Sequence, residues 1–272
     1  MSDMVLTRKN SRIFRELNTV ITVMARDITL FFKSISTPLM SFAFPLLMMG
    51  AIGGNLAKNM AGSLNFSFGP FMLVGMLVNM LFMMTSMNMT SFVSDRHIDF
   101  MQEMLVSPVS RYSLVVGKIF GSMFSAIVSL VGTLIVGLVM GITLKAGQLL
   151  LILALSPLMC LSGGALAMIL IGLVKNRTAA SMAVSFVTVP QMFLSGAIIP
   201  INHSSGVLLV LSRCLPMTYC LDLVRAVIYG GTPDYSSVVM FNPFINFIVI
   251  VVLTILFLFI GTFFFARSEK NR

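Results

Sequence analysis

The sequence predicts an all-α protein that crosses a membrane several times. Of its 272 residues, 57% are apolar and 10% are charged, whereas a soluble domain carries about 25% charged residues. Long runs without a charged residue recur along the chain. In a bilayer such runs form helices, because each backbone polar group must be paired within its own segment. This composition excludes an ordinary soluble domain, and it excludes a disordered chain, which needs low hydrophobicity and high charge.

Residues 1–33 predict an amphipathic helix that lies in the cytoplasmic membrane interface. Its apolar residues recur at steps of three and four, as a helix with one apolar face requires; they are Ile13, Leu17, Val20, Ile21, Met24 and Ile28. The basic residues lie mostly elsewhere on the helix, as in interfacial anchors. The segment lacks a short apolar core followed by a cleavage site, so we do not expect a signal peptide. Whether this anchor also touches a cytoplasmic partner stays open.

Six charge-free runs follow, each longer than the roughly 20 residues that cross a hydrocarbon core. They predict a transmembrane domain over residues 34–272, with spans near 34–54, 69–93, 114–141, 148–174, 179–200 and 243–266. The connection between the last two spans is long and contains short apolar stretches.

The distribution of lysine and arginine predicts that both termini are cytoplasmic. Six spans place both ends on one side, and cytoplasmic loops carry the excess of basic residues. All but four of the 18 basic residues fall on the side of the termini; the exceptions are Lys58, Lys145, Arg213 and Arg225. The net charge of +9 therefore reflects membrane orientation, and we expect no nucleic-acid partner.

Motifs of several enzyme classes are missing from the sequence. The predicted spans contain no aspartate or glutamate, which argues against a proton pump with its own carboxylate relay. His97 and His203 fall on opposite sides of the membrane, so they cannot share a metal. No G-x-x-x-x-G-K-[ST] motif occurs, so this chain has no phosphate-binding loop of its own. We expect no catalytic residue, no metal and no disulfide framework among the three cysteines.

The most charged segment of the chain lies between the second and third spans, over residues 94–111. Residues 95–105 can form a short helix, which Pro108 ends because the residue before a proline disfavours the helical region. A short charged helix outside the membrane can dock a partner protein. A solvated turn explains the same pattern equally well.

A second unusual connection, residues 203–234, lies on the outer side and is long for a plain loop. Its apolar stretches are each too short to cross, and Arg213 and Pro216 interrupt them. This pattern predicts short re-entrant helices in the outer leaflet, forming a cap over the bundle. Asp222 and Arg225 lie three residues apart on one helical face, where they can pair.

These segments resemble the membrane permease subunits of type-2 ABC exporters, in the drug-resistance branch. Three motifs carry the resemblance, in order along nearly the whole chain. They are Glu103–Arg111 followed by Gly117-Lys118, Phe193–Pro200 at the end of the fifth span, and Leu215–Tyr219 together with Asp222 and Arg225. The chain departs from the pattern at Pro216-Met217, where many relatives carry Asn-Pro.

The resemblance implies a multi-pass subunit of an ATP-driven exporter in the cytoplasmic (inner) membrane of a prokaryote. Two permeases would pair, and two ABC ATPase subunits would bind beneath them, holding the ATP and Mg that this chain does not bind. The charged loop would be the coupling helix, and the outer helices would cap the exit. The implied coupling residues are Asp95, Arg96, Asp99, Glu103, Pro108, Arg111 and Lys118. The implied residues of the outer segment are Pro216, Tyr219, Asp222 and Arg225.

A methionine stripe on the second span is a candidate substrate surface. It comprises Met80, Met83, Met84 and Met87, and Asn79 lies nearby. Flexible, polarisable methionine suits an amphipathic drug or a lipid-like substrate, although methionine serves packing more often. The pairs Gly117/Gly121 and Gly137/Gly141 have the spacing of close helix contacts, within one subunit or between two. The alternative function is a membrane scaffold or assembly factor that transports nothing; a membrane-embedded transferase is disfavoured by the missing carboxylates and histidines.

Overall fold

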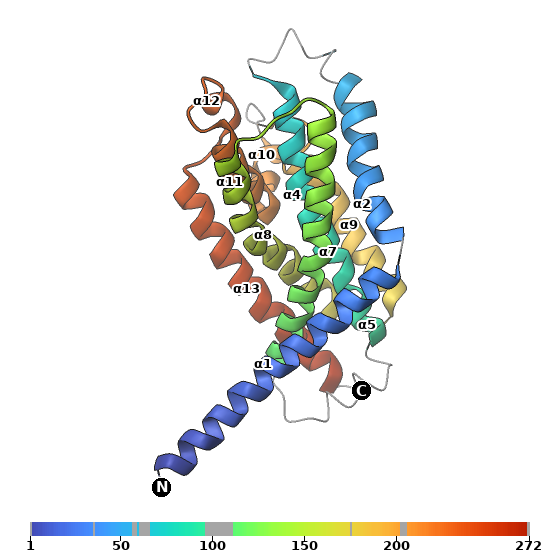
Figure 1. Ribbon diagram of the computed structural model, residues 1–272, viewed down its shortest axis with the longest axis vertical. Helices are drawn as coiled ribbons and strands as arrows, with labels where there is room; N and C mark the ends of the chain where they lie inside the picture. Colours follow the sequence, from blue (N-terminus) through green and yellow to red (C-terminus); the bar gives the residue numbers. More distant parts are fainter. Residues whose placement is uncertain are drawn as a thin grey trace.

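The computed structural model describes residues 2–34, 36–55, 59, 66–95, 111–174, 176–201 and 206–270, and within these residues it is helical with no strand. Figure 1 shows the long helices running side by side along the long axis of the molecule. In chain order the elements are α1 (Ser2–Lys33), α2 (Ser36–Leu47), the π-helical turn η1 (Met48–Gly53), α4 (Phe68–Met89), α5 (Ser91–Asp95), α7 (Arg111–Val139), α8 (Ala146–Gly172), α9 (Arg177–Leu194), α10 (Val207–Cys214), α11 (Pro216–Tyr229), α12 (Tyr235–Val238) and α13 (Pro243–Lys270).

Among the described residues, four stretches are long and apolar enough to cross a membrane. They are Phe68–Val93, Ser113–Val139, Ala146–Gly172 and Tyr235–Phe264. Two bent pairs raise the number to six when each pair counts as one span: Phe14–Lys33 with Pro38–Gly53, and Val207–Cys214 with Pro216–Tyr229. The prediction of an all-α membrane protein is confirmed, with four to six candidate spans.

The fifth predicted span, residues 179–200, is a shorter helix than expected. Helix α9 ends at Leu194, and Gly196 then adopts a left-handed conformation with φ of +84°, which turns the chain. Helix α9 contacts both α5 and α10. It is not among the four long apolar stretches.

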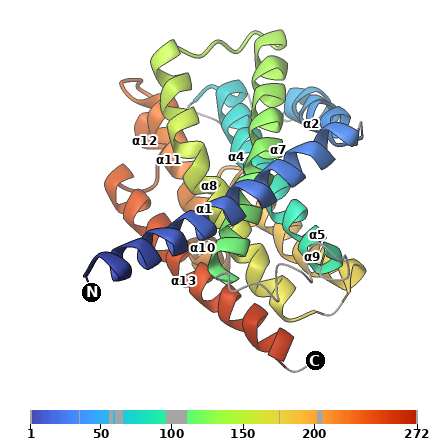
Figure 2. The same ribbon diagram turned by 60° about the horizontal axis from the view of Figure 1, so that its bottom comes forward.

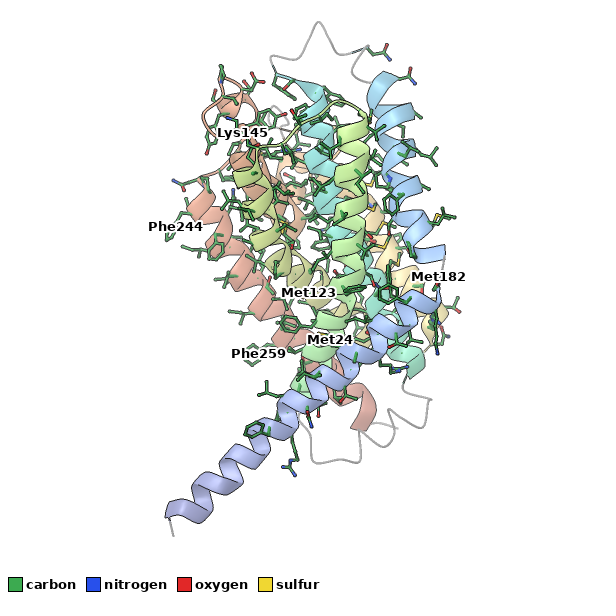
Figure 3. The ribbon with its side chains drawn as sticks, viewed as in Figure 1. Met24, Met123, Lys145, Met182, Phe244 and Phe259 are labelled. Atoms are coloured by element: carbon green, nitrogen blue, oxygen red, sulfur yellow. The ribbon has the colours of Figure 1, made fainter. Side chains whose placement is uncertain are left out.

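The two ends of the described chain lie at the same end of the bundle (Figure 1). The connection from α7 to α8 and the short helix α12 lie at the opposite end. Figure 3 shows Lys145 near this opposite end, far from Met24 and Phe259. This arrangement agrees with an even number of crossings.

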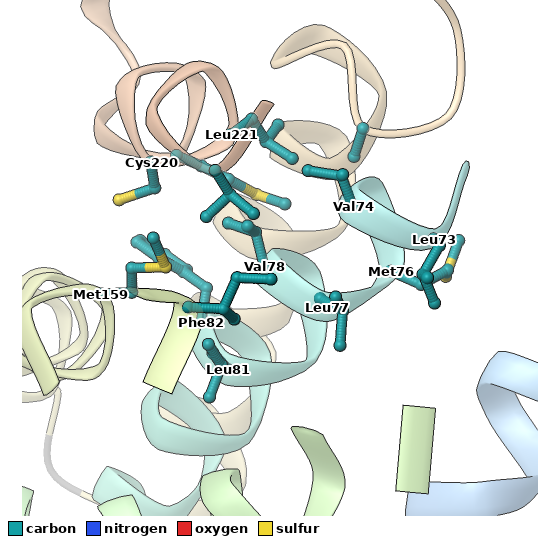
Figure 4. Close-up of a cluster of buried hydrophobic side chains, with 14 of the residues drawn as sticks. Leu73, Val74, Met76, Leu77, Val78, Leu81, Phe82, Met159, Cys220 and Leu221 are labelled. Carbon is teal, nitrogen blue, oxygen red and sulfur yellow. The ribbon is translucent and has the colours of Figure 1, made fainter. Parts of the chain in front are cut away.

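Helix α4 forms the centre of the bundle. It is apolar on all sides, as a fully buried helix must be, and the stretch Phe71–Phe82 is buried without interruption. Figure 4 shows Val74, Val78 and Phe82 of α4 gathered with Met159 of α8 and residues of α11. The elements around α4 are therefore positioned by their contacts with it.

Helix α1 packs along one face against α7, and Figure 2 shows it crossing α7 obliquely. The buried face is centred on Val23, a residue outside the predicted apolar stripe. Leu17 and Ile21 of that stripe are more than half exposed, so they remain available to lipid. Helix α1 therefore packs one side against the protein and exposes apolar residues on another side.

We expect the two ends of the bundle to lie on opposite sides of the membrane. In a variant with all three cysteines replaced by serine, Lys145→Cys should react with a membrane-impermeant maleimide in intact cells. Arg267→Cys should react only after the membrane is opened. Both positions are exposed, so the reaction with maleimide depends only on the side of the membrane on which each cysteine lies. Reaction of Arg267→Cys in intact cells would contradict the orientation inferred from the basic residues.

Candidate functional site

The outer segment folds into two helices, α10 and α11, that meet at a bend of 83°. Pro216 is the first residue of α11, where its missing N–H costs no hydrogen bond. The hydroxyl of Tyr219 donates to the carbonyl of Arg213 over 2.7 Å, and its ring stacks on Phe241 with centroids 5.7 Å apart. Two of the predicted residues, Pro216 and Tyr219, thus shape and close the bend.

Asp222 holds the start of α13 against α11. Its carboxylate accepts hydrogen bonds from the backbone N–H of Met240 (2.7 Å) and Phe241 (2.8 Å) and from the side-chain amide of Asn246 (2.7 Å). The residue is 1% exposed. A negative charge next to a helix N-terminus is also favoured by the helix dipole. Asp222 therefore joins the outer segment to the last span.

Arg225, one turn further along α11, is also 1% exposed. Its Nη2 donates to the carbonyl oxygen of Gly196. The guanidinium carbon lies 4.0 Å from the centre of the Phe71 ring of α4, a cation–π contact. A buried guanidinium requires such partners, because an unpaired charge is very costly outside water. Arg225 therefore joins α11 to α4 and to the turn after α9.

Asp222 and Arg225 influence each other electrostatically, but their charged groups form their close contacts with different elements. Both residues lie in the described part of the chain, and no ion pair forms between them there. Asp222 bonds toward α13, whereas Arg225 bonds toward Gly196 and Phe71. A spacing of three residues allows two side chains to meet, but here each side chain forms its hydrogen bonds with a neighbouring element.

The turn after α9 meets α4 backbone to backbone. A Cβ atom on Gly75 would lie 1.8 Å from the carbonyl oxygen of Ala197, so only glycine fits there. The neighbouring Gly196 supplies the acceptor for Arg225. The second and third sequence motifs, separated along the chain, are therefore brought together around one end of α4. We call this set the outer hub: Phe71, Gly75, Gly196, Asp222 and Arg225.

A cavity of about 350 Å³ lies beside the outer hub, between the start of α4, the connection from α7 to α8, and the end of α11. The Tyr229 hydroxyl donates to the carbonyl of Ser67, and the Ser67 N–H donates to the Asp234 carboxylate. Lys145 contributes a positive charge to the lining. The polar side chains Gln148, Tyr229 and Asp234 also belong to the lining.

The coupling segment predicted between the second and third spans falls mostly outside the described residues. Arg96, Asp99, Glu103 and Pro108 belong to this part. Asp95 is the last residue of α5 and Arg111 is the first residue of α7. Both helix ends lie at the same end of the bundle as the termini (Figure 1).

Lys118, which the resemblance places among the coupling residues, is 1% exposed. Its ammonium group lies 2.7 Å from the carboxylate of Asp27, and the two side chains are 2% and 9% exposed. Lys118 lies inside α7 and Asp27 inside α1, so the ion pair holds these two helices together. The predicted coupling residue thus acts within the chain.

The glycine pairs also act within one subunit. Added Cβ atoms at Gly117 and Gly121 would meet Val20 and Asp27 of α1, and one at Gly137 would meet Leu73 of α4. Gly141 lies in the turn after α7 with φ of +81°. The spacing allowed close helix contacts within one subunit or between two subunits. Gly117, Gly121 and Gly137 form such contacts within the subunit.

A family model for ABC-2 type transporters matches residues 18–229. The chain belongs to this family. The match begins within α1 and ends at the last residue of α11, so it contains the outer hub and the Asp27–Lys118 pair. No curated protein matches the chain. The protein is therefore a multi-pass membrane subunit of an ABC transporter.

In this ABC-2 subunit the predicted methionine stripe is only partly accessible. Asn79 and Met80 are buried in the bundle, whereas Met83, Met84 and Met87 are half-buried. The Asn79 Oδ1 atom is buried without a hydrogen-bond partner among the described residues. Such orphan polar atoms are uncommon in native proteins and need an explanation.

Sequence reasoning missed Gln191, which shares this property. It is completely buried in α9, which packs on α4, and both of its amide atoms lack a partner among the described residues. The available signal was that Gln191 is the only amide side chain in α9. Among the described residues, no group of three His, Cys, Asp or Glu side chains could hold a metal.

We expect Gly75→Ala to destabilise the protein by about 1–3 kcal/mol, the usual cost of overpacking. The added methyl group would collide with the Ala197 carbonyl, which is backbone and cannot move aside cheaply. Thermal unfolding in detergent measures the effect. Gly147→Ala is the matched control, since nothing lies within 4 Å of its Cβ position. Equal unfolding temperatures for the two variants would contradict the close approach.

Asp222→Ala should lower the free energy of unfolding by about 3 kcal/mol, because it leaves several buried donors without an acceptor. The donors are the N–H groups of Met240 and Phe241 and the Asn246 amide. Asp234→Ala is the control: its half-buried carboxylate accepts from the Ser67 N–H at the outer end, and we expect a smaller loss. A larger loss for Asp234→Ala would show that Asp222 does not hold α13.

Proposed function

We propose that this chain is the membrane-spanning subunit of an ATP-driven exporter, with ATP hydrolysis on a separate ABC ATPase subunit. The observation that carries the proposal is the ABC-2 match over residues 18–229. The absence of a phosphate-binding loop from the sequence supports a separate ATPase. ATP and Mg would then bind to that partner.

The ATPase binds at the end of the bundle that carries the termini. The predicted coupling segment joins α5 to α7 at this end, and its polar residues Arg96, Asp99 and Glu103 are the ones we assign to partner contacts. Closure of the ATPase pushes this segment, and Pro108 and Arg111 pass the motion to α7. The basic residues concentrated toward this end support its cytoplasmic location.

The substrate class that fits the described residues is an amphipathic drug or a lipid-like molecule. Met83, Met84 and Met87 present thioether side chains that adapt to apolar groups of varied shape. Asn79 and Gln191 hold buried polar atoms that could bond a substrate's polar group once α4 and α9 separate. These features support a path that begins along α4.

The outer segment caps the exit of this path. The outer hub ties α11 to α4, α13 and the turn after α9, so the cap is held by buried bonds on three sides. A second copy of the permease completes the path in the cytoplasmic membrane of a prokaryote. Large apolar side chains such as Met182 and Phe186 on α9 are exposed, which suits contact with lipid or with this second copy.

Gentle purification of the tagged chain from native membranes tests the proposal. We expect a P-loop ATPase to copurify in stoichiometric amount, and Glu103→Arg to remove it or to abolish ATP-dependent transport. Asp234→Arg, a charge change of the same kind at the outer end, should leave the ATPase bound. A folded, dimeric permease without any ATPase would favour the scaffold alternative instead.

A further inference from the structure

Helices α1 and α2 form a bent pair, and both halves lie against α7. The bend between Phe14–Lys33 and Pro38–Gly53 measures 68°. One half therefore follows the inner part of α7 and the other follows its outer part (Figure 1). Each half is joined to α7 by a buried polar contact.

The first contact is the Asp27–Lys118 ion pair, at 2.7 Å. It lies beside a groove that two glycines make in α7. A Cβ on Gly117 would come within 3.0 Å of the Val20 Cα, and one on Gly121 would come within 2.8 Å of the Asp27 Cβ. The missing side chains allow α1 to approach closely enough for the short Asp27 side chain to reach Lys118.

The second contact joins α2 to α7. The hydroxyl groups of Ser41 and Ser129 share a buried hydrogen bond of 2.7 Å. A third glycine, Gly132, lies next to it, and a Cβ there would be 3.2 Å from the Ser41 carbonyl oxygen. Small residues on α7 thus face the bent pair near both polar contacts.

We propose that the Asp27–Lys118 ion pair and the Ser41–Ser129 hydrogen bond fasten α1 and α2 to α7, so that the three helices move as one rigid body during transport. Asp27 and Lys118 are then positioning residues, which pass movement of the coupling end to the first and third spans together. This inference rests on the proposed transport function.

The physical reason is the cost of separating buried charges. Sliding or lifting α1 from α7 would break the contact between the Asp27 carboxylate and the Lys118 ammonium in a poorly solvated place, which is strongly unfavourable. The Ser41–Ser129 bond sets the register of the outer half, since one helical step along α7 would break it. Movement between the bent pair and α7 is therefore resisted at two separate points.

A cross-linking experiment tests whether the bent pair and α7 stay together. Ser41→Cys/Ser129→Cys, in a variant without native cysteines, places two thiols where hydroxyl oxygens lie 2.7 Å apart, so a disulfide can form. We expect the oxidised protein to transport as fast as the reduced one. The two single variants control for oxidation itself. Loss of transport on oxidation, with recovery on reduction, would overturn the proposal because it would show that the helices must part.

Charge variants test the ion pair itself. Asp27→Asn should lower transport by about tenfold or more, since it removes the charge that the buried Lys118 meets on α1. ATP hydrolysis per folded complex should change little. Asp27→Lys/Lys118→Asp restores opposite charges and should recover much of the transport. Equal loss of hydrolysis and transport in Asp27→Asn would indicate a merely structural role and would contradict the assignment.

A distance measurement separates failure of this inference from failure of the proposed function. Spin labels at Ile21→Cys and Phe120→Cys, both exposed positions on α1 and α7, report whether the two helices stay together. In the variant without native cysteines we expect one narrow distance distribution, and a broader one when Asp27→Asn is added. An unchanged distribution would refute the fastening. Absence of ATP-driven transport by the wild-type chain, with the narrow distribution intact, would refute only the proposed function.

Discussion

Charged side chains can be buried in a membrane-spanning bundle only when each one meets a partner inside it. This constraint organises both ends of the molecule. At the outer end, Asp222 accepts three hydrogen bonds from the α12–α13 connection and from Asn246, and Arg225 lies between the Gly196 carbonyl and the Phe71 ring. At the inner end, Lys118 meets Asp27. In each case the partner of the buried charge lies on another element. The bond that stabilises the charge therefore also positions a helix.

Close contacts through glycine also position the helices around α4. Gly75 lets α4 approach the turn after α9. Gly163 lets α8 approach α4, since a Cβ atom on Gly163 would lie 2.8 Å from the Phe82 carbonyl oxygen. Ser86 adds a hydrogen bond to the Gly163 carbonyl over 2.9 Å. Without a hydrophobic driving force between helices in lipid, such close packing is a main source of helix association. The central helix α4 is therefore in close contact with α8 and with the turn after α9.

The sequence motifs indicated four residues that bond within the outer segment, but they did not indicate the contact between Lys118 and Asp27. Pro216, Tyr219, Asp222 and Arg225 all take part in the bend or the outer hub, because residue types such as proline and buried charge have few uses in an apolar segment. Lys118 was assigned to partner docking since it lies next to a motif on the cytoplasmic side. Its actual partner, Asp27, is distant in the chain, and no local pattern indicates that distance. Gln191 was missed because a single amide in a helix carries no periodic signal.

The class of structure follows from composition: apolar runs without charges can satisfy their backbone groups in a bilayer only as helices, which predicts the all-α fold and the approximate spans. The sequence motifs also indicated the ABC-2 family, which the match over residues 18–229 shows. The bonds between helices, in contrast, could be assigned only from the way the helices pack. Asp222 and Arg225 are close to each other in the sequence, yet they form hydrogen bonds with different elements. The reason is geometric: spacing along a helix sets which face a side chain occupies, whereas the partner on that face depends on how separate helices pack.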